Sequence, residues 1–536
     1  MLRALPCALF AFLQAQLVHA RSVALLLQLP AIEAMLLAAM GSFESKNQAD
    51  VYSQSMKCFT DDELNKLQDL FSEITKNEGD HFDRKDLENF LSKTFPTRVI
   101  HAIFNEMSRI SMSPPSHHAE SDMISINFEV FCHFISRLLK KTLTEKTRIY
   151  LTITAGFQSK AAKCTQLLKF CELIVTAYLH TGLNGRCSDS QQISSWLLTL
   201  DRQALHQFAR FLLTDLLISS PKQEKSLLSA FNSSTTIESD SSQFSIDEIE
   251  QWLVKTPLIT RIADELFMAC FMDQTSVHQE EKSHIVQADK TDLDDDDDDD
   301  DENDETTTDI LIPLCILEDN KPSQLLTYST ILMLNNHLEH QLRHEWKLLF
   351  SSLQHGESFT TLCSRIINKG PTLLIIRDIK GHIFGGFASQ NWNYKSQFFG
   401  DSKCFLFTAN PKMSVYTTTR YNKNYQYLNC NMQTLPNGLG MGGQFDYFGL
   451  WIDAEYGKGH SMAGPKCTTY GSPQLSGNKT FEIDCLEVWS IGKKKKDDDN
   501  DENKRSILDQ DPSAKALLEL MGKKQHSEGL REPENN

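Results

Sequence analysis

The chain has 536 residues, more than one hydrophobic core usually serves, so its length predicts about two to four domains. Its formal net charge of −18 disfavours a surface that neutralises phosphates, which argues against nucleic acid as a partner. Hydrophobic residues make up 40% of the chain, which excludes a wholly disordered protein. The thirteen cysteines contain no CxxC pair, so neither a disulfide scaffold nor a zinc finger is expected.

The N-terminal residues carry two conflicting signals. Arg3, the apolar stretch 4–18 and the small residue Ala20 are typical of a signal peptide. The sequence MGSFES at 40–45 instead matches the N-myristoylation pattern, with Gly41 as the lipidated residue, if translation begins at Met40. An ordinary Met-Gly turn is the alternative. Because one myristoyl chain binds a membrane only marginally, the lipid hypothesis requires a second membrane or protein contact.

From about residue 60 to residue 257, apolar residues recur at three- and four-residue spacing, which predicts a series of amphipathic helices. Between them, segments 77–86, 121–131 and 239–252 have the outline of EF-hand loops, a polar loop followed by a helix. Their calcium ligands are poor, and Glu248 is the best that survives. We therefore expect degenerate EF-hand-like pairs retained for structure, with calcium sensing as an alternative.

An unbroken aspartate run at 294–301 predicts a solvated acidic linker, because it has no apolar side chains to pack. After it, 325–338, 345–353 and 359–367 are predicted to be helices. Short β-rich runs between Gly, Pro and Asn turns then predict a sandwich-like sheet core with flanking helices. The predicted strands are 372–377, 383–388, 403–408, 414–418, 426–429, 447–453 and 481–490.

The C-terminal segment predicts one short helix behind a charged linker. Asp511 is a good cap, Pro512 fits the first helical position and Gly522 fits the stop. Because a short helix is marginal alone, it is expected to dock either on its own domain or in another protein's groove. Its apolar stripe consists of Ala514, Leu517, Leu518 and Met521.

Patterns that carry chemistry are weak in this sequence. His337, His340 and His344 could share one helix face, although exposed histidines explain them without a metal. The glycine-rich run 436–444 departs from both nucleotide-binding glycine patterns, and close backbone approach within a sheet explains it better. No GxSxG elbow or protease-like cysteine signature occurs. We therefore expect no catalytic site, no metal and no cofactor.

Two further segments, 444–451 and 456–460, mix polar and aromatic residues as a binding surface does. Tyr447, Phe448 and Trp451 within them are nevertheless expected to be buried and to pack a small sheet.

Seven short blocks in order make the segment from about 325 to 492 resemble the TLDc domain family. They are WKLLFSS at 346–352, HGESF at 355–359, GPT at 370–372, FGGFA at 384–388, PNGLGMGG at 436–443, FGLW at 448–451 and LEVW at 486–489. The resemblance implies a non-catalytic interaction domain whose relatives associate with the vacuolar proton-pumping ATPase. It also implies a link to oxidative-stress resistance.

The EF-hand-like region, the SIL tail at 506–508 and HSEGLRE at 526–532 narrow the resemblance to a lysosomal, TOR-linked branch of this family. The resemblance begins at Met40, which implies that residues 1–39 come from an upstream start or a gene-model extension. It further implies a myristoylated Gly41 and an adaptor in the cytoplasm and on the cytosolic face of the lysosomal membrane that promotes TOR signalling. Its implied partners are vacuolar ATPase subunits, TOR pathway components and, through the lipid, the lysosomal membrane.

The expected fold class is α+β, with an N-terminal all-α EF-hand-like helical domain, a TLDc domain that has a β-sandwich core and flanking helices, and a C-terminal helix. The partner-binding residues of that last helix are expected to be Leu517, Leu518 and Met521. The expected segments are a signal-like or spurious extension at 1–39, a myristoylation-type N-terminus at 40–58, the helical domain at 59–275, an acidic linker at 276–309, the TLDc domain at 310–492, a charged linker at 493–505, and the C-terminal helix and tail at 506–536.

The alternative from a different class is an oxidative-stress-protective enzyme with redox or hydrolytic activity. It would use a residue on the TLDc surface, for which Cys404, Cys467 and Glu487 are the candidates. A redox cysteine requires a thiol with a lowered pKa, so titration of the thiols distinguishes this hypothesis from the adaptor.

Overall fold

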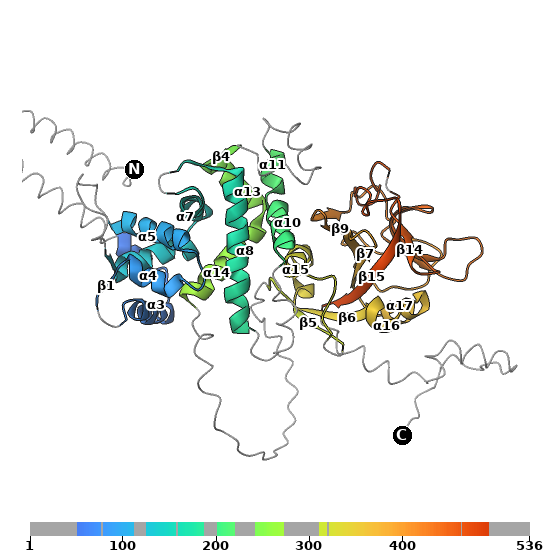
Figure 1. Cartoon of the computed structure of the whole chain (residues 1–536), viewed down its shortest axis with the longest axis horizontal. Coiled ribbons are helices and arrows are strands. Elements are labelled where there is room, and N and C mark those ends of the chain that lie inside the picture. The colour runs from blue at the N-terminus through green and yellow to red at the C-terminus, as the bar shows by residue number, and fades with distance from the viewer. Residues whose placement is uncertain are drawn as a thin grey trace, which may run out of the picture. The chain divides into compact units, whose positions relative to one another are not determined.

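The structure is a computed structural model that describes residues 51–76, 79–111, 125–156, 159–186, 201–219, 242–272, 310–318, 321–462 and 464–492. The chain divides into two compact units, Met1–Glu302 and Asn303–Asn536. Helices dominate the first unit and a sheet the second, which confirms the predicted α+β class (Figure 1). The predicted lipidation residue Gly41 and the predicted partner-binding residues Leu517, Leu518 and Met521 lie outside the described residues.

The helices of the first unit begin where the sequence offers a capping side chain. Thr60, Asp83 and Ser245 each form a capping box, in which the cap and the third helical residue satisfy each other's backbone N–H groups. The helices are α3 (Asp61–Ile74), α4 (Arg84–Leu91), α5 (Thr97–Ser111), α6 (Phe128–Ile135), η1 (Ser136–Lys140), α7 (Leu143–Ala155), α8 (Cys164–Arg186), α10 (Arg202–Leu212), α11 (Thr214–Ser219), α13 (Ile246–Lys255) and α14 (Pro257–Phe271).

Two miniature sheets join the loops of the first unit in pairs. β1 (His81–Phe82) pairs with β2 (Ile126–Asn127), and β3 (Ala161–Lys163) pairs with β4 (Gln243–Ser245), both antiparallel. This loop-to-loop pairing is the arrangement expected of EF-hand-like pairs. Three of the four loops coincide with the predicted outlines. The loop before β3 was not predicted because its sequence, GFQSKAAK at 156–163, contains no carboxylate.

The second unit is built around one long strand, β15, which pairs with β6, β7 and β14 (Figure 1). Its strands are β5 (Leu314–Ile316), β6 (Glu345–Ser351), β7 (Thr372–Asp378), β8 (Ile383–Ala388), β9 (Phe405–Asn410), β10 (Ser414–Thr417), β11 (Gln426–Asn429), β12 (Gly438–Gln444), β13 (Tyr447–Asp453), β14 (Lys458–His460) and β15 (Thr480–Ile491). Its helices are α15 (Tyr328–Asn335), η4 (His340–Leu342), α16 (Ser352–His355) and α17 (Phe359–Ile366). The strand order is β10-β9-β8-β7-β15-β14-β13-β12-β11. The sheet therefore has two halves, with β7 to β10 on one side of β15 and β11 to β14 on the other.

The two halves of this sheet pack face to face over one hydrophobic core. A side chain on Gly386 in β8 would meet the Sδ atom of Met441 in β12 at 2.5 Å, so these strands lie closely opposed. The core draws buried residues from both halves and from α17, among them Leu362, Leu374, Ile376, Leu406, Leu439, Met441, Leu450 and Leu486. The predicted sandwich-like core is therefore present.

Two helix predictions in this unit are wrong in part. The segment 345–353, predicted to be helical, forms β6 and the start of α16. Its buried residues Trp346, Leu348 and Phe350 alternate with more exposed ones, which is the period of a strand rather than of a helix. The helix predicted at 325–338 is shorter and ends at Asn335. The glycine-rich run forms β12, in line with its predicted place inside a sheet.

Candidate functional site

The three histidines considered for a metal do not share a helix face. α15 ends before His337, whose Nδ1 donates to the carbonyl of Met333 at 2.8 Å, and His340 begins a separate helical turn, η4. Burial lowers the pKa of His337. Among the residues that the structure describes, no three His, Cys, Asp or Glu side chains come together in a group that could hold a metal ion.

The EF-hand-like loops use their acidic residues to cap helices. The Glu248 carboxylate, the best predicted calcium ligand, accepts from the backbone N–H of Ser245 at 2.8 Å. Asp86 in the first loop does the same for the N–H of Asp83 at 3.0 Å. A cavity of about 640 Å³ adjoins β1 and β2, with Asp80 and Glu129 as its acidic lining residues. These contacts agree with loops retained for structure.

The two cysteines of the enzyme alternative are buried, so their predicted place on the TLDc surface is wrong. The Cys404 thiol lies beside the Gln426 Oε1 atom at 3.5 Å and accepts from the Ser389 N–H at 3.4 Å. Burial raises the pKa of Cys404, the opposite of what a reactive thiol requires. Cys467 is also buried, with its Sγ atom close beneath Gly442 and Gly449.

The third candidate of that alternative, Glu487, is only 1% exposed and serves as a structural acceptor. Its carboxylate accepts from the Ser323 hydroxyl at 2.6 Å, the Gln324 N–H at 2.9 Å and the indole of Trp489 at 3.2 Å. Glu487 therefore ties the segment before α15 to the last strand of the sheet. Burial raises its pKa, an effect that these three hydrogen bonds oppose.

Two substitutions at Glu487 distinguish the effect of its charge on stability from the effect of its hydrogen bonds. Between the ordinary carboxyl pKa and the higher folded value, the folded chain binds more protons than the unfolded chain, so the free energy of unfolding falls as pH rises. Glu487→Gln is expected to remove this slope. Glu487→Ala leaves the Ser323 and Gln324 donors without their acceptor and is expected to cost about 1–3 kcal/mol at any pH.

Urea unfolding of the full chain between about pH 4.5 and pH 7 checks both variants. Glu482→Gln, at an exposed position of the same strand, is the matched control. Equal pH slopes for the wild type and Glu487→Gln would show that the buried carboxyl does not carry the effect.

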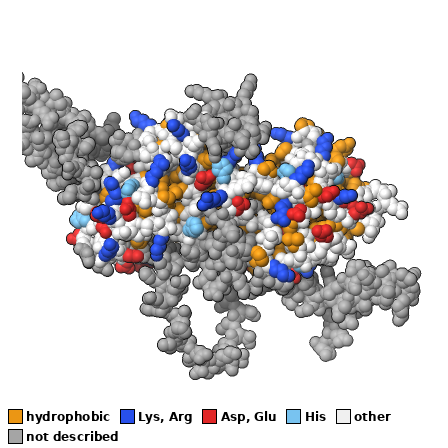
Figure 2. Space-filling model, in the orientation of Figure 1, with side chains coloured by type: hydrophobic (Ala, Val, Ile, Leu, Met, Phe, Trp, Pro, Cys, Tyr) orange, Lys and Arg blue, Asp and Glu red, His pale blue; other side chains and the backbone are white. Residues whose placement is uncertain are grey.

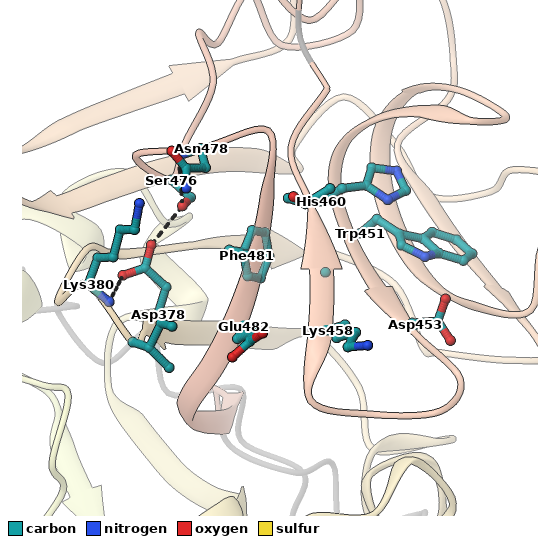
Figure 3. A pocket seen from close by; sticks show the side chains of 13 residues that line it. Asp378, Lys380, Trp451, Asp453, Lys458, His460, Ser476, Asn478, Phe481 and Glu482 are labelled. Atoms are coloured by element: carbon teal, nitrogen blue, oxygen red, sulfur yellow. Dashed lines mark hydrogen bonds between the residues drawn. The ribbon is translucent and has the colours of Figure 1, made fainter.

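A pocket of about 500 Å³ lies where the β7–β8 turn meets β13, β14 and the start of β15 (Figure 3). On one side, Asp378 accepts from the backbone N–H groups of Lys380 at 2.9 Å and His382 at 2.8 Å, and from the Ser476 hydroxyl at 2.7 Å. Although burial acts in the opposite direction, these bonds hold the pKa of Asp378 below its usual value. The Ser476 hydroxyl donates to the Asp378 carboxylate and not to His382. Asp378, His382 and Ser476 therefore form a network that holds the turn, and not the hydrogen-bonded nucleophile and base of a catalytic site.

The other side of the pocket combines aromatic and charged residues. The ring of His460 on β14 stacks on Trp451 of β13, with centroids 5.8 Å apart, and burial lowers the pKa of His460. Lys458 lies opposite Glu482 in the strand register, and Asp453 also lines the pocket. Acidic and basic side chains both line the pocket, so it offers polar contacts without a strong electrostatic potential of one sign (Figure 3).

The predicted aromatic packing is confirmed for two of three residues. Phe448 and Trp451 are buried and stack at 4.3 Å, in a cluster with Tyr427. Tyr447, predicted to be buried with them, is 59% exposed. Tyr447 is the first residue of β13, and it is not part of the buried cluster. Sequence periodicity could not distinguish this end position from the positions inside the strand.

Comparison with known proteins gives one family match and three similar proteins. The family profile of the TLDc domain matches residues 320–492. The chain is 37% identical over 454 residues to the MTOR-associated protein MEAK7 of Gallus gallus, which covers 83% of this chain and 87% of that protein. It is 33% identical over 505 residues to the MTOR-associated protein MEAK7 of Homo sapiens, which covers 92% of this chain and 99% of that protein. Nuclear receptor coactivator 7 of Homo sapiens is 31% identical over 183 residues, 32% of this chain and 18% of that protein.

The sheet unit, with its sandwich core and the matched residues, therefore defines a TLDc domain protein. The chain belongs to the family of the MTOR-associated protein MEAK7. The predicted resemblance is confirmed. Within the described part of the chain, no helix combines the length and the apolar character that crossing a membrane requires.

Proposed function

We propose that this protein is a non-catalytic, TOR-linked adaptor in the cytoplasm and on the cytosolic face of the lysosomal membrane, where it associates with the vacuolar proton-pumping ATPase and promotes TOR signalling. The observation that carries the TOR link is the similarity to MTOR-associated proteins over 92% of this chain and 99% of the human relative. The lysosomal site and the ATPase partner rest on the resemblance of the TLDc blocks and of the terminal segments to their family.

The environment of the candidate reactive groups supports an adaptor over an enzyme. Cys404 and Glu487 are enclosed and engaged by neighbouring groups, and burial raises the pKa of both. On the face shown in Figure 2, acidic and basic side chains are interspersed with apolar ones. The alternative of a redox activity predicts a thiol with a lowered pKa, and titration of the thiols in the full chain checks it.

Two weak contacts are proposed to hold the adaptor in place. A myristoyl group on Gly41 supplies marginal membrane binding, and the predicted C-terminal helix supplies a second contact through Leu517, Leu518 and Met521. Joining two weak contacts in one chain raises the effective concentration of the second once the first has formed. The pair can therefore hold the chain at the lysosome where either contact alone would not.

A charge placed on the apolar stripe tests the second contact. Leu518→Asp is expected to lower recovery of the vacuolar ATPase with the full chain by about tenfold, because a carboxylate would enter a desolvated groove. Ala516→Asp adds the same charge to the opposite side of the predicted helix and is expected to leave recovery unchanged. Thermal unfolding of both variants checks that the fold is intact. Equal recovery for Leu518→Asp and the wild type would remove the helix from the proposal.

A further inference from the structure

The loop between β10 and β11 presents the most exposed large apolar side chain among the described residues. Tyr421 in this loop is 80% exposed, and Tyr447 at the start of β13 is 59% exposed. Arg420 and Lys423 flank the first tyrosine, and the exposed Lys466 belongs to a neighbouring loop. We call these five residues the loop surface.

Hydrogen bonds hold the β10–β11 loop against the loop that carries Lys466. The Thr419 N–H donates to the carbonyl of Thr469 at 2.8 Å, and the Thr419 hydroxyl donates to the carbonyl of Thr468 at 2.5 Å. The Asn422 amide donates to the Thr468 hydroxyl at 3.0 Å and accepts from the Thr469 hydroxyl at 2.7 Å. Such a set of bonds fixes the loop without a hydrophobic core of its own.

A second set of bonds joins the same loop to the β12–β13 hairpin. The Asn424 amide donates to the carbonyl of Gly443 at 2.7 Å, and the Gly442 N–H donates to the carbonyl of Asn424 at 3.0 Å. The Gly443 N–H in turn donates to the Thr469 hydroxyl at 2.9 Å. Three loops therefore act as one preorganised body, and little ordering entropy remains to be lost when a partner binds.

Both tyrosines of the loop surface directly follow a residue in the left-handed backbone region. Arg420 has φ 63° and Asp446 has φ 67°, a conformation that is uncommon for residues with a side chain. Glycine would adopt this conformation without strain. In both cases the turn directs the next side chain, Tyr421 or Tyr447, into solvent.

The charges of these loops indicate the kind of partner. The loop surface holds three cations, and Asp446 is the carboxylate on the adjoining hairpin turn, whereas the chain as a whole has a net charge of −18. Arginine and tyrosine are the residue types that most often dominate the energy of protein interfaces. Three cations are fewer than the roughly four to eight that mark recognition of anionic lipids.

We propose that the loop surface binds a carboxylate-rich patch on a partner protein, with Tyr421 as its central anchor and Arg420 and Lys423 as its ion-pairing groups. The inference rests on the proposed function, because the partner is taken to be a component of the vacuolar ATPase assembly. The loop surface is then the part of the TLDc domain that contacts this partner.

Binding of the full chain to purified vacuolar ATPase at several salt concentrations tests the inference. Tyr421→Ala, and separately Arg420→Gln with Lys423→Gln, are expected to weaken binding at least tenfold at low salt. The double variant is also expected to lose most of the salt dependence seen with the wild type, because the screened ion pairs are absent.

Three control variants separate binding from folding. Arg420→Gly removes the charge but suits the left-handed backbone, so it is expected to keep or raise the thermal midpoint while weakening binding. Ile379→Ala removes a side chain that is 62% exposed on the β7–β8 turn, and Lys347→Gln removes an exposed cation on β6. These last two are expected to bind like the wild type.

Each result has a distinct meaning. If the wild type binds the ATPase and the loop variants bind it equally well, this inference is overturned and the proposed function still stands. No binding by the wild type would overturn the proposed function and this inference with it. If the variants lose binding to phosphatidylcholine–phosphatidylserine vesicles but keep binding to the ATPase, the loop surface is a membrane contact, and the protein-partner inference is overturned.

Discussion

Gly385→Ala is expected to destabilise the TLDc domain by more than about 3 kcal/mol or to prevent its folding. The added Cβ atom would lie 1.9 Å from the carbonyl oxygen of Leu374 on the neighbouring strand, and 2.9 Å from a ring atom of Phe407. The first of these atoms belongs to the backbone of β7, so no side-chain rotation relieves the collision. The strands β7 and β8 would have to separate at the centre of the sheet.

Thermal unfolding of the full chain measures this effect, with Gly464→Ala as the matched control. A Cβ atom on Gly464 meets nothing within 4 Å, so the same substitution is expected to change the midpoint little. A Gly385→Ala chain that unfolds at the wild-type temperature would contradict the close approach of β7 and β8.

Glu106→Ala is expected to cost about 3 kcal/mol in the free energy of unfolding of the helical unit. Glu106 is 3% exposed, and its carboxylate pairs with the buried Arg137 at 3.0 Å and with Arg109 at 2.7 Å. Removing it leaves the Arg137 guanidinium buried with one remaining partner, Glu145. The cost arises because the buried Arg137 charge is then compensated only in part, and not from the strength of the lost pair.

The control for this buried pair is a more exposed pair in the same unit, formed by Arg148 with Glu145. Arg148 is 58% exposed at its side chain and lies 3.5 Å from Glu145, so Arg148→Ala is expected to cost less than about 1 kcal/mol. Denaturant unfolding of both variants checks the contrast. Similar losses for Glu106→Ala and Arg148→Ala would mean that burial does not set the cost at Glu106.

Much of the fold was predictable from the sequence because its strongest signals are local. Thr60 and Ser245 cap helices within predicted helical regions, and the predicted strands between turn residues form with small shifts at their ends. The failure at β6 has a physical cause. Its residues Trp346, Leu348 and Phe350 fit a strand face, but the interspersed Leu349 also fits a helical stripe, and only pairing with β5 and β15 decides between them.

The candidate sites were less predictable, because burial and long-range hydrogen bonds determine them. Nothing in the sequence around Cys404 or Glu487 shows that each is enclosed by neighbours from distant segments, such as Gln426 and Ser323. The exposure of Tyr421 depends in the same way on bonds from Thr468 and Thr469, about fifty residues further along the chain. A polar loop such as TTRYNKNY at 418–425 carries no distinctive local signal.

Quantitative mass spectrometry of the complex recovered with the tagged full chain from intact lysosomes tests the adaptor proposal most directly. We expect vacuolar ATPase subunits to be enriched with the chain, and its N-terminal peptide to begin with myristoylated Gly41. An N-terminus near Arg21 without enriched ATPase subunits would place the chain in a secretory lumen and contradict the proposed adaptor.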